Sequence, residues 1–137
     1  MIDRLWSGIA AYIRTHAITV LFGCASLPGT NPLRLAQPLS FLHHHHLAPP
    51  EWCPHAVPAR YVDMEILPPA AVDPRAAWAD LPPLLKGYLR LGAMIGDGAV
   101  VDRQFNTTDV CVVLPTERLT ERYLRRYPAA VNARKVA

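Results

Sequence analysis

Carboxylates and small polar residues gather between residues 97 and 109, where they could bind a cationic group. Asp102 and Asp109 each border an apolar run, and carboxylates at such positions form charge-assisted hydrogen bonds with amines. Aspartate and asparagine also build turns. We favour a turn for Asp97, which lies between two glycines. The hypothesis of substrate binding is assigned to Asp102, Asp109, Asn106 and Thr108.

Four consecutive histidines, His43 to His46, invite comparison with a metal site. Adjacent histidines on a helix cannot all face one ion, and the sequence shows no second cluster with the spacing of zinc ligands. Cys53 and His55 are nearby, but the intervening Pro54 fits no ligand pattern. We therefore predict no metal site and a structural or solvent-facing role for the histidines, with adventitious nickel binding.

Cys24, Cys53 and Cys111 are the three cysteines, and no two have the CxxC spacing. An odd number without that motif argues against a secreted disulfide framework and favours a reducing cytoplasm. Cys24 and Cys111 lie in apolar runs, where cysteine is usually buried. No histidine is placed to activate Cys24, so the sequence does not support a cysteine nucleophile.

The composition is that of a single folded domain. The chain has 137 residues, of which 51% are hydrophobic and 18% charged, which argues against disorder. Fourteen prolines against seven glycines predict long irregular connections. A net charge of +3 is weak, and no basic stripe is interleaved with aromatics, so we expect no nucleic-acid partner. No signal peptide or spanning segment is evident, which predicts a soluble or peripheral protein.

The first half of the chain predicts two helices and two strands. Apolar residues at helical spacing indicate a helix from about Leu5 to His16. Residues 18–27 are almost continuously apolar, which predicts a strand buried on both faces. A helix over residues 33–46 should be kinked or divided at Pro38. Residues 47–59 are proline-rich and predict a loop, and residues 60–67 predict a short strand.

The second half predicts the elements that would position the polar cluster. Asp73-Pro74 is a helix-entry signal, and residues 81–91 form an amphipathic helix with Gly92 as its C-cap. Strands are expected at residues 93–95, 99–101 and 110–114. A last helix from Thr116 would carry an arginine-rich face, with residues 128–137 as a frayed tail. Strands flanked by helices indicate an α/β or α+β fold with partial helical cover of a sheet.

Several long strings occur here in the order found in one known family. They are LWSGIAAY, LFGCASLPG, SFLHHHHLAPP, LPPLLKGYLRLGAMIGDGAVVD and FNTTDVCVVLP, and they extend from Leu5 to about Tyr127. The pattern resembles the C-terminal part of ornithine-acyl carrier protein N-acyltransferases, the hemolysin-like group of the GNAT superfamily. A GNAT-like fold with a proline-rich insert over residues 1–127 is the corresponding expectation.

This resemblance implies transfer of a (3-hydroxy)fatty acyl group from acyl carrier protein to the α-amino group of ornithine, the first step of ornithine lipid synthesis. The donor would be the phosphopantetheine thioester of the carrier protein, with no bound cofactor. By its position before Gly92, Tyr88 resembles the GNAT tyrosine near the donor sulfur. A core aromatic is the alternative for Tyr88. The polar cluster would then receive the side-chain amine of ornithine.

The family's donor loop and carboxylate base would precede Met1, so we expect a truncated chain with weak or no activity. One alternative is a non-catalytic remnant or interaction module, which predicts an exposed apolar sheet edge. Another is an N-acyl amino acid synthase with a different acceptor. The expected location is cytoplasmic. The arginine-rich last helix could also contact an anionic inner membrane peripherally, although a solvated helix face is the commoner explanation.

Overall fold

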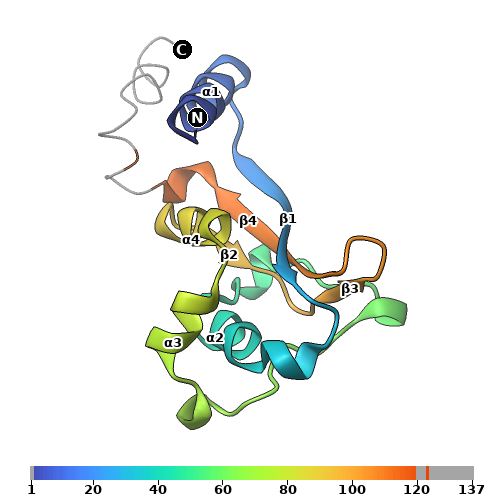
Figure 1. The fold of residues 1–137 in the computed structure, drawn as a ribbon. Coiled ribbons are helices and arrows are strands. Elements are labelled where there is room, and N and C mark those ends of the chain that lie inside the picture. Colours follow the sequence, from blue (N-terminus) through green and yellow to red (C-terminus); the bar gives the residue numbers. More distant parts are fainter. Residues whose placement is uncertain (1, 120–122, 124–137) are drawn as a thin grey trace.

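The computed structural model describes residues 2–119 and Tyr123, and it shows an α+β fold (Figure 1). Helices and strands do not alternate regularly, and short 3-10 helices punctuate the proline-rich connections. The predicted fold class is confirmed in its α+β form. The helices and strands, in chain order, are α1 (Ile2–His16), β1 (Val20–Pro28), α2 (Ala36–His46), α3 (Pro74–Asp80), α4 (Pro83–Arg90), β2 (Met94–Ile95), β3 (Val100–Asp102) and β4 (Thr107–Pro115).

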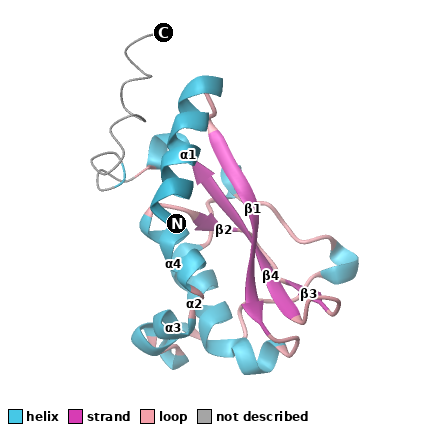
Figure 2. Cartoon of the chain, turned by 45° about the horizontal axis from the view of Figure 1, so that its top comes forward, coloured by secondary structure: helices cyan, strands magenta, loops and turns pink. Residues whose placement is uncertain are grey.

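The sheet is antiparallel and is built around β4. Strand β1 pairs with one side of β4 along its whole length, while β2 and β3 pair successively with the other side. The helices α1 to α4 lie together on one side of this sheet (Figure 2). Strand β4 is therefore the element through which every other strand is placed.

The core forms where one face of β4 meets the helices. Val110, Val112 and Leu114 are all buried and alternate along the strand, as one face of a pleated strand requires. Helix α2 adds Leu39 and Leu42, both with no exposed surface. Burying a leucine side chain stabilises a fold by about 1.5–3 kcal/mol. The packing of these side chains therefore holds the helices against the sheet.

Strand β1 departs from the prediction that both of its faces are buried. Among the described residues it pairs only with β4 and forms an edge of the sheet. Phe22 is 79% exposed and Cys24 is exposed as well, so the predicted burial of Cys24 was wrong. An apolar run shows that a segment can be buried, but it does not show whether a neighbouring strand is present to cover it. An exposed apolar sheet edge is what the alternative of a non-catalytic remnant or interaction module predicts.

Three other predicted elements differ from the structure. Residues 60–67 are not a strand, because only one isolated bridge, between Val62 and Ala99, connects this segment to the sheet. The helix over residues 33–46 is divided, but the change from 3-10 to α-helix comes at Ala36, and Pro38 lies within the first turn of α2. Proline is tolerated there because its missing N–H would be unpaired anyway. At the expected start of the last helix the structure has a 3-10 helix over Thr116–Arg118, and most of the residues predicted for that helix lie outside the described part of the chain.

Two predicted helix ends are confirmed, the start of α3 and the glycine that follows α4. Asp73 caps α3, since its side chain accepts hydrogen bonds from the backbone N–H groups of Arg75 and Ala76. Gly92 follows α4 with a φ of +101°, and the N–H of Ala93 donates to the carbonyl of Tyr88 at 3.1 Å. This pattern is that of a glycine C-cap. It fixes the turn of α4 that carries Tyr88.

Among the described residues, no helix is long and apolar enough to cross a membrane. Arg122, Arg125 and Arg126 of the expected arginine-rich face lie outside the described part of the chain, as do residues 128–137.

Candidate functional site

An apolar pocket opens beside the exposed edge of the sheet. Its cavity volume is about 180 Å³, which corresponds to roughly six water molecules at about 30 Å³ each. Helix α1, strand β1, helix α4 and strand β4 all contribute to its wall, which is largely apolar. The lining residues are Trp6, Ile9, Leu21, Phe22, Gly23, Cys24, Tyr88, Val112 and Leu114.

Tyr88 is one wall of this pocket. Its ring is half-buried and packs edge-on against Trp6 of α1, with the ring centroids 5.6 Å apart. Tyr88 also packs against the hydrophobic core, as the alternative of an aromatic on the core face of the helix predicts, and its role in catalysis stays a prediction. Trp6 itself is held in place by α1, whose Ala10 is buried. The chain thus presents Tyr88 as part of the wall of a small, largely apolar cavity.

The polar residues predicted to bind substrate have local partners in the structure. The Asp102 carboxylate accepts hydrogen bonds from the N–H groups of Gln104 and Phe105, at 3.0 and 3.1 Å. The Asp109 carboxylate accepts one from the Thr107 hydroxyl at 2.8 Å. These contacts are those of a β3–β4 turn, the alternative weighed for aspartates in this segment.

Thr108 and Asn106 also take structural positions. Thr108 is completely buried, and its hydroxyl donates to the carbonyl of Gly29 at 2.8 Å. Asn106 is exposed with a φ of +57°, and its carbonyl accepts from the Gly29 N–H at 2.9 Å. Both residues join the β3–β4 turn to the end of β1.

None of these four polar residues lines the pocket that Tyr88 borders. The pocket meets β4 at Val112 and Leu114, and Asp109 lies three residues before Val112 on the same strand. At about 3.4 Å per residue this places Asp109 roughly 10 Å along the strand from the nearest pocket residue of β4. The predicted role of the polar cluster in substrate binding stays a prediction.

A second hollow lies on the other face of the sheet and shares Phe22 with the first. Its volume is about 260 Å³, and the loop at residues 50–54 forms one side of it. Cys111 opposes Cys24 across the β1–β4 pair, and it lines this hollow together with Cys53. Burial raises the pKa of the Cys53 and Cys111 thiols, which keeps both as poor nucleophiles.

The carboxylate of Asp97 also contacts side chains that are distant in the sequence. Its carboxylate accepts a hydrogen bond from the Tyr61 hydroxyl at 2.7 Å and lies 3.2 Å from Nδ1 of His55. Gly98, with a φ of +88°, lets the ring of Tyr61 pack directly on the backbone, where a Cβ would collide with it. Sequence reasoning missed these two partners because they are 36 and 42 residues away from Asp97.

The Asp97 contact predicts a measurable pH effect. Donation to the carboxylate raises the pKa of Tyr61 from 10.0 to about 12. The folded state therefore holds this proton more tightly than the unfolded state, so the contribution to stability is complete below pH 10 and is lost as the pH rises from 10 to 12. Difference titration of phenolate absorbance should show that Tyr61→Phe removes a component near pH 12.

Asp97→Asn is the matched variant for this titration. It keeps the size of the side chain but removes the charge, so the Tyr61 component should move toward pH 10. A Tyr61 component that titrates unchanged in Asp97→Asn would contradict the contact.

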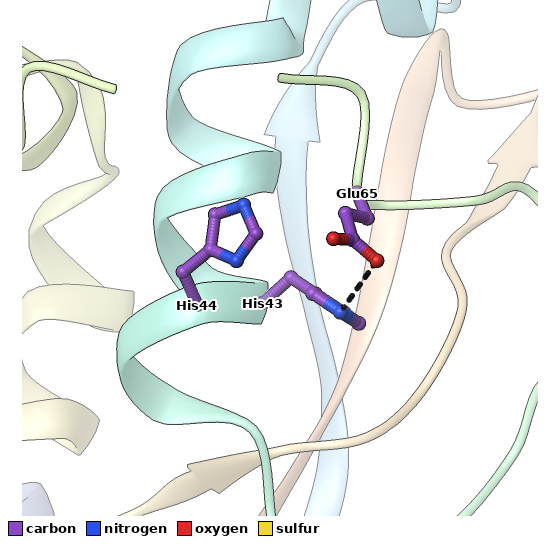
Figure 3. Close-up of side chains that lie close together, drawn as sticks. All are labelled: His43, His44 and Glu65. Atoms are coloured by element: carbon purple, nitrogen blue, oxygen red, sulfur yellow. Dashed lines mark ion pairs between the residues drawn. The ribbon is translucent and has the colours of Figure 1, made fainter. Parts of the chain in front are cut away.

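Two of the four consecutive histidines meet a carboxylate in the structure. His43 and His44, on the last turn of α2, lie beside Glu65, with Nε2 of His43 3.6 Å from the carboxylate (Figure 3). The sequence alone did not indicate this arrangement, because Glu65 is a single glutamate 22 residues after His43 and belongs to no cluster of ligand residues. His45 and His46 instead pack against Phe41, with ring centroids 4.9 and 5.3 Å apart.

The structure thus defines an α+β chain with an apolar pocket, walled by a tyrosine, at the edge of its sheet. The chain is similar to an L-ornithine N(alpha)-acyltransferase of Brucella abortus (strain 2308), with 50% identity over 131 residues, 96% of this chain and 47% of the relative. A protein of the same name from Rhizobium meliloti (strain 1021) is 51% identical over 93% of this chain and 43% of its own length. A third, from Rhodobacter capsulatus, is 45% identical over 95% and 49%.

These similarities confirm the resemblance to ornithine acyltransferases that the sequence strings indicated. The chain spans about half the length of the curated relatives it matches. No protein-family model matches the chain, and no solved structure gives a significant match. The predicted GNAT relationship therefore stays a prediction.

Proposed function

We propose that this chain forms the donor side of an N-acyltransferase site, in which a fatty acyl group passes from the thioester of acyl carrier protein to the α-amino group of ornithine. The observation that supports this most is the apolar pocket walled by Tyr88 at the open edge of β1. The names of the similar proteins supply the acceptor amino acid. The pocket supplies an apolar surface for a fatty chain.

The reaction forms an amide and releases a thiol. The amine nitrogen bonds to the thioester carbonyl carbon, and the carbon–sulfur bond breaks after a tetrahedral intermediate forms. The ammonium nitrogen loses two protons as it becomes an amide N–H: the departing thiolate gains one of them overall, and the other is released to solvent. In the proposal, the Tyr88 hydroxyl donates a proton or a hydrogen bond to that sulfur.

Each part of the pocket has a role in this proposal. The fatty chain contacts Trp6, Leu21 and Val112, because apolar surface leaves water favourably at about 25 cal/mol per Å². The pantetheine arm enters along the exposed edge of β1, where unpaired backbone groups can form hydrogen bonds with its amides. Acyl carrier protein would dock outside that edge. The proposed donor is a substrate, so no resident cofactor is required.

The non-catalytic alternative rests on a specific observation, the exposed edge of β1 with Phe22 79% exposed. Such an edge can pair with another chain. If the chain is an interaction module, it should self-associate through this edge and show no affinity for acyl pantetheine thioesters. Sedimentation velocity with and without an acyl pantetheine distinguishes the two functions.

Filling the pocket provides a direct test. Gly23 lines it, and a Cβ added there has no atom within 4 Å, so Gly23→Leu places a side chain in the cavity without a backbone clash. We expect the affinity for a long-chain acyl pantetheine to fall at least tenfold, about 1.4 kcal/mol. Fluorescence titration of the tryptophans, which include Trp6 in the pocket wall, measures it.

Gly8→Leu is the matched control for this test. Gly8 also has no atom within 4 Å of an added Cβ, but it does not line the pocket. Its affinity should stay within twofold of the unmodified protein. Equal affinity for Gly23→Leu and Gly8→Leu would place the acyl chain elsewhere.

A further inference from the structure

His43, His44 and Glu65 form a compact set of metal-ligand types outside the proposed acyl site. The two histidines come from the end of α2, and the carboxylate comes from the connection that follows the 3-10 helix Pro58–Arg60. One ligand atom from each residue lies within 4.8 Å of the others. Figure 3 shows the three side chains gathered between the helix and that connection.

His44 is already oriented as a ligand. Its Nε2 atom lies 2.8 Å from the carbonyl oxygen of Leu67. A carbonyl can only accept, so Nε2 carries the hydrogen and the neutral ring keeps its lone pair on Nδ1. Histidine ligands of metals usually donate their other N–H to a carbonyl or carboxylate in this way, which fixes the ring and its tautomer.

His43 has a nitrogen that lacks a partner. Its Nδ1 is buried and makes no hydrogen bond with any residue that the structure describes. Its Nε2 faces Glu65 at 3.6 Å, which is longer than a hydrogen bond. Nε2 and the carboxylate therefore face each other without a direct hydrogen bond. A cation between them would be bound by both Nε2 and Glu65.

We propose that His43, His44 and Glu65 bind a zinc-type divalent cation. Two imidazoles and one carboxylate are a ligand set that zinc uses, with a water molecule completing the tetrahedron. Ligand distances of about 2.0–2.1 Å put neighbouring donor atoms roughly 3.3 Å apart. The Glu65 side chain is 56% exposed, so it can make the small movement required.

The surroundings favour a cation at this place. The three residues lie at the C-terminal end of α2, where the free carbonyls and the helix dipole carry negative charge. The Leu67 N–H already donates to the Ser40 hydroxyl of α2 at 2.9 Å. The bound ion would add a second connection between α2 and residues 65–67. The proposal is independent of the proposed acyltransferase function.

Zinc titration by calorimetry of the whole chain tests the proposal. We expect one Zn²⁺ per chain, and at least a tenfold loss of affinity in each of His43→Asn, His44→Asn and Glu65→Gln. His45→Asn is the matched control, because His45 is exposed and stacks on Phe41 outside the cluster. Its affinity should stay within twofold.

The adjacent histidines make adventitious binding the competing explanation. If His45→Asn weakens binding as much as His44→Asn does, or if Glu65→Gln leaves the affinity unchanged, the ion is held by exposed histidines and the proposal is wrong. Glu65→Gln changes an exposed side chain, so it is the variant most certain to fold. Tetrahedral-type Co²⁺ absorption, lost in His44→Asn and kept in His45→Asn, is the second measurement.

Discussion

Replacing Tyr88 with phenylalanine is expected to lower kcat for acyl transfer to ornithine about 10²-fold or more, because general acids contribute about 10²–10⁴-fold to such reactions. Because this chain alone is expected to have weak or no activity, the rate is measured in a fusion of the chain to the N-terminal part of the Brucella abortus relative. The variant keeps the ring that packs on Trp6. The affinity for the acyl pantetheine and the melting temperature should therefore be nearly unchanged. Mass spectrometry of N-acyl ornithine under single-turnover conditions measures the rate of the chemical step.

Tyr12→Phe is the control for this experiment. Tyr12 is 58% exposed on α1 and does not line the pocket, so removing its hydroxyl should leave kcat within twofold. A Tyr88→Phe protein that retains the full rate would show that the hydroxyl has no part in protonating the leaving group. A fall in affinity with no change in kcat would assign Tyr88 to donor binding alone.

Replacing Gly92 with alanine is expected to destabilise the protein by roughly 2–4 kcal/mol. Its φ of +101° is unfavourable for any residue with a side chain, and the added Cβ would lie 2.5 Å from the backbone carbonyl of Arg118. That carbonyl cannot rotate away as a flexible side chain would. Because Gly92 also ends the turn that carries Tyr88, acyl binding should weaken along with stability.

Chemical denaturation of Gly92→Ala gives the free energy of unfolding directly. Gly8→Ala is the control, and it should raise the free energy of unfolding. Gly8 is an exposed residue within α1, and no atom lies within 4 Å of an added Cβ. Alanine in a helix is favoured over glycine by about 1 kcal/mol. A Gly92→Ala protein as stable as the unmodified chain would mean that the C-cap and the Arg118 contact are not formed as described.

Local signals in the sequence predicted the elements that depend on neighbouring residues. Asp73 before Pro74 and Gly92 after an amphipathic run act within a few residues, so α3 and the end of α4 were predicted correctly. The pairing of β1 with β4 could not be predicted from neighbouring residues, because residues that pair, such as Cys24 and Cys111, are far apart in the sequence. The exposure of Phe22 could not be predicted either, because it depends on which strands lie beside β1.

The same distinction applies to the candidate sites. Tyr88 was identified through a resemblance carried by contiguous strings, and the structure adds the pocket and Trp6 as its neighbour. Asp102 and Asp109 were identified from residue type alone, which does not distinguish a ligand from a turn. No sequence pattern indicated Glu65 as a metal ligand, because a single glutamate becomes a candidate only after the fold places it beside His43.

The most direct test of the account is to locate the acyl donor on the protein. A long-chain acyl pantetheine with a photoreactive diazirine in its chain is bound, irradiated and mapped by peptide mass spectrometry. We predict labelling of the pocket walls, at residues 21–24 of β1 and at Trp6 or Tyr88. Labelling confined to residues 50–54, which line the hollow on the opposite face of the sheet, would contradict it.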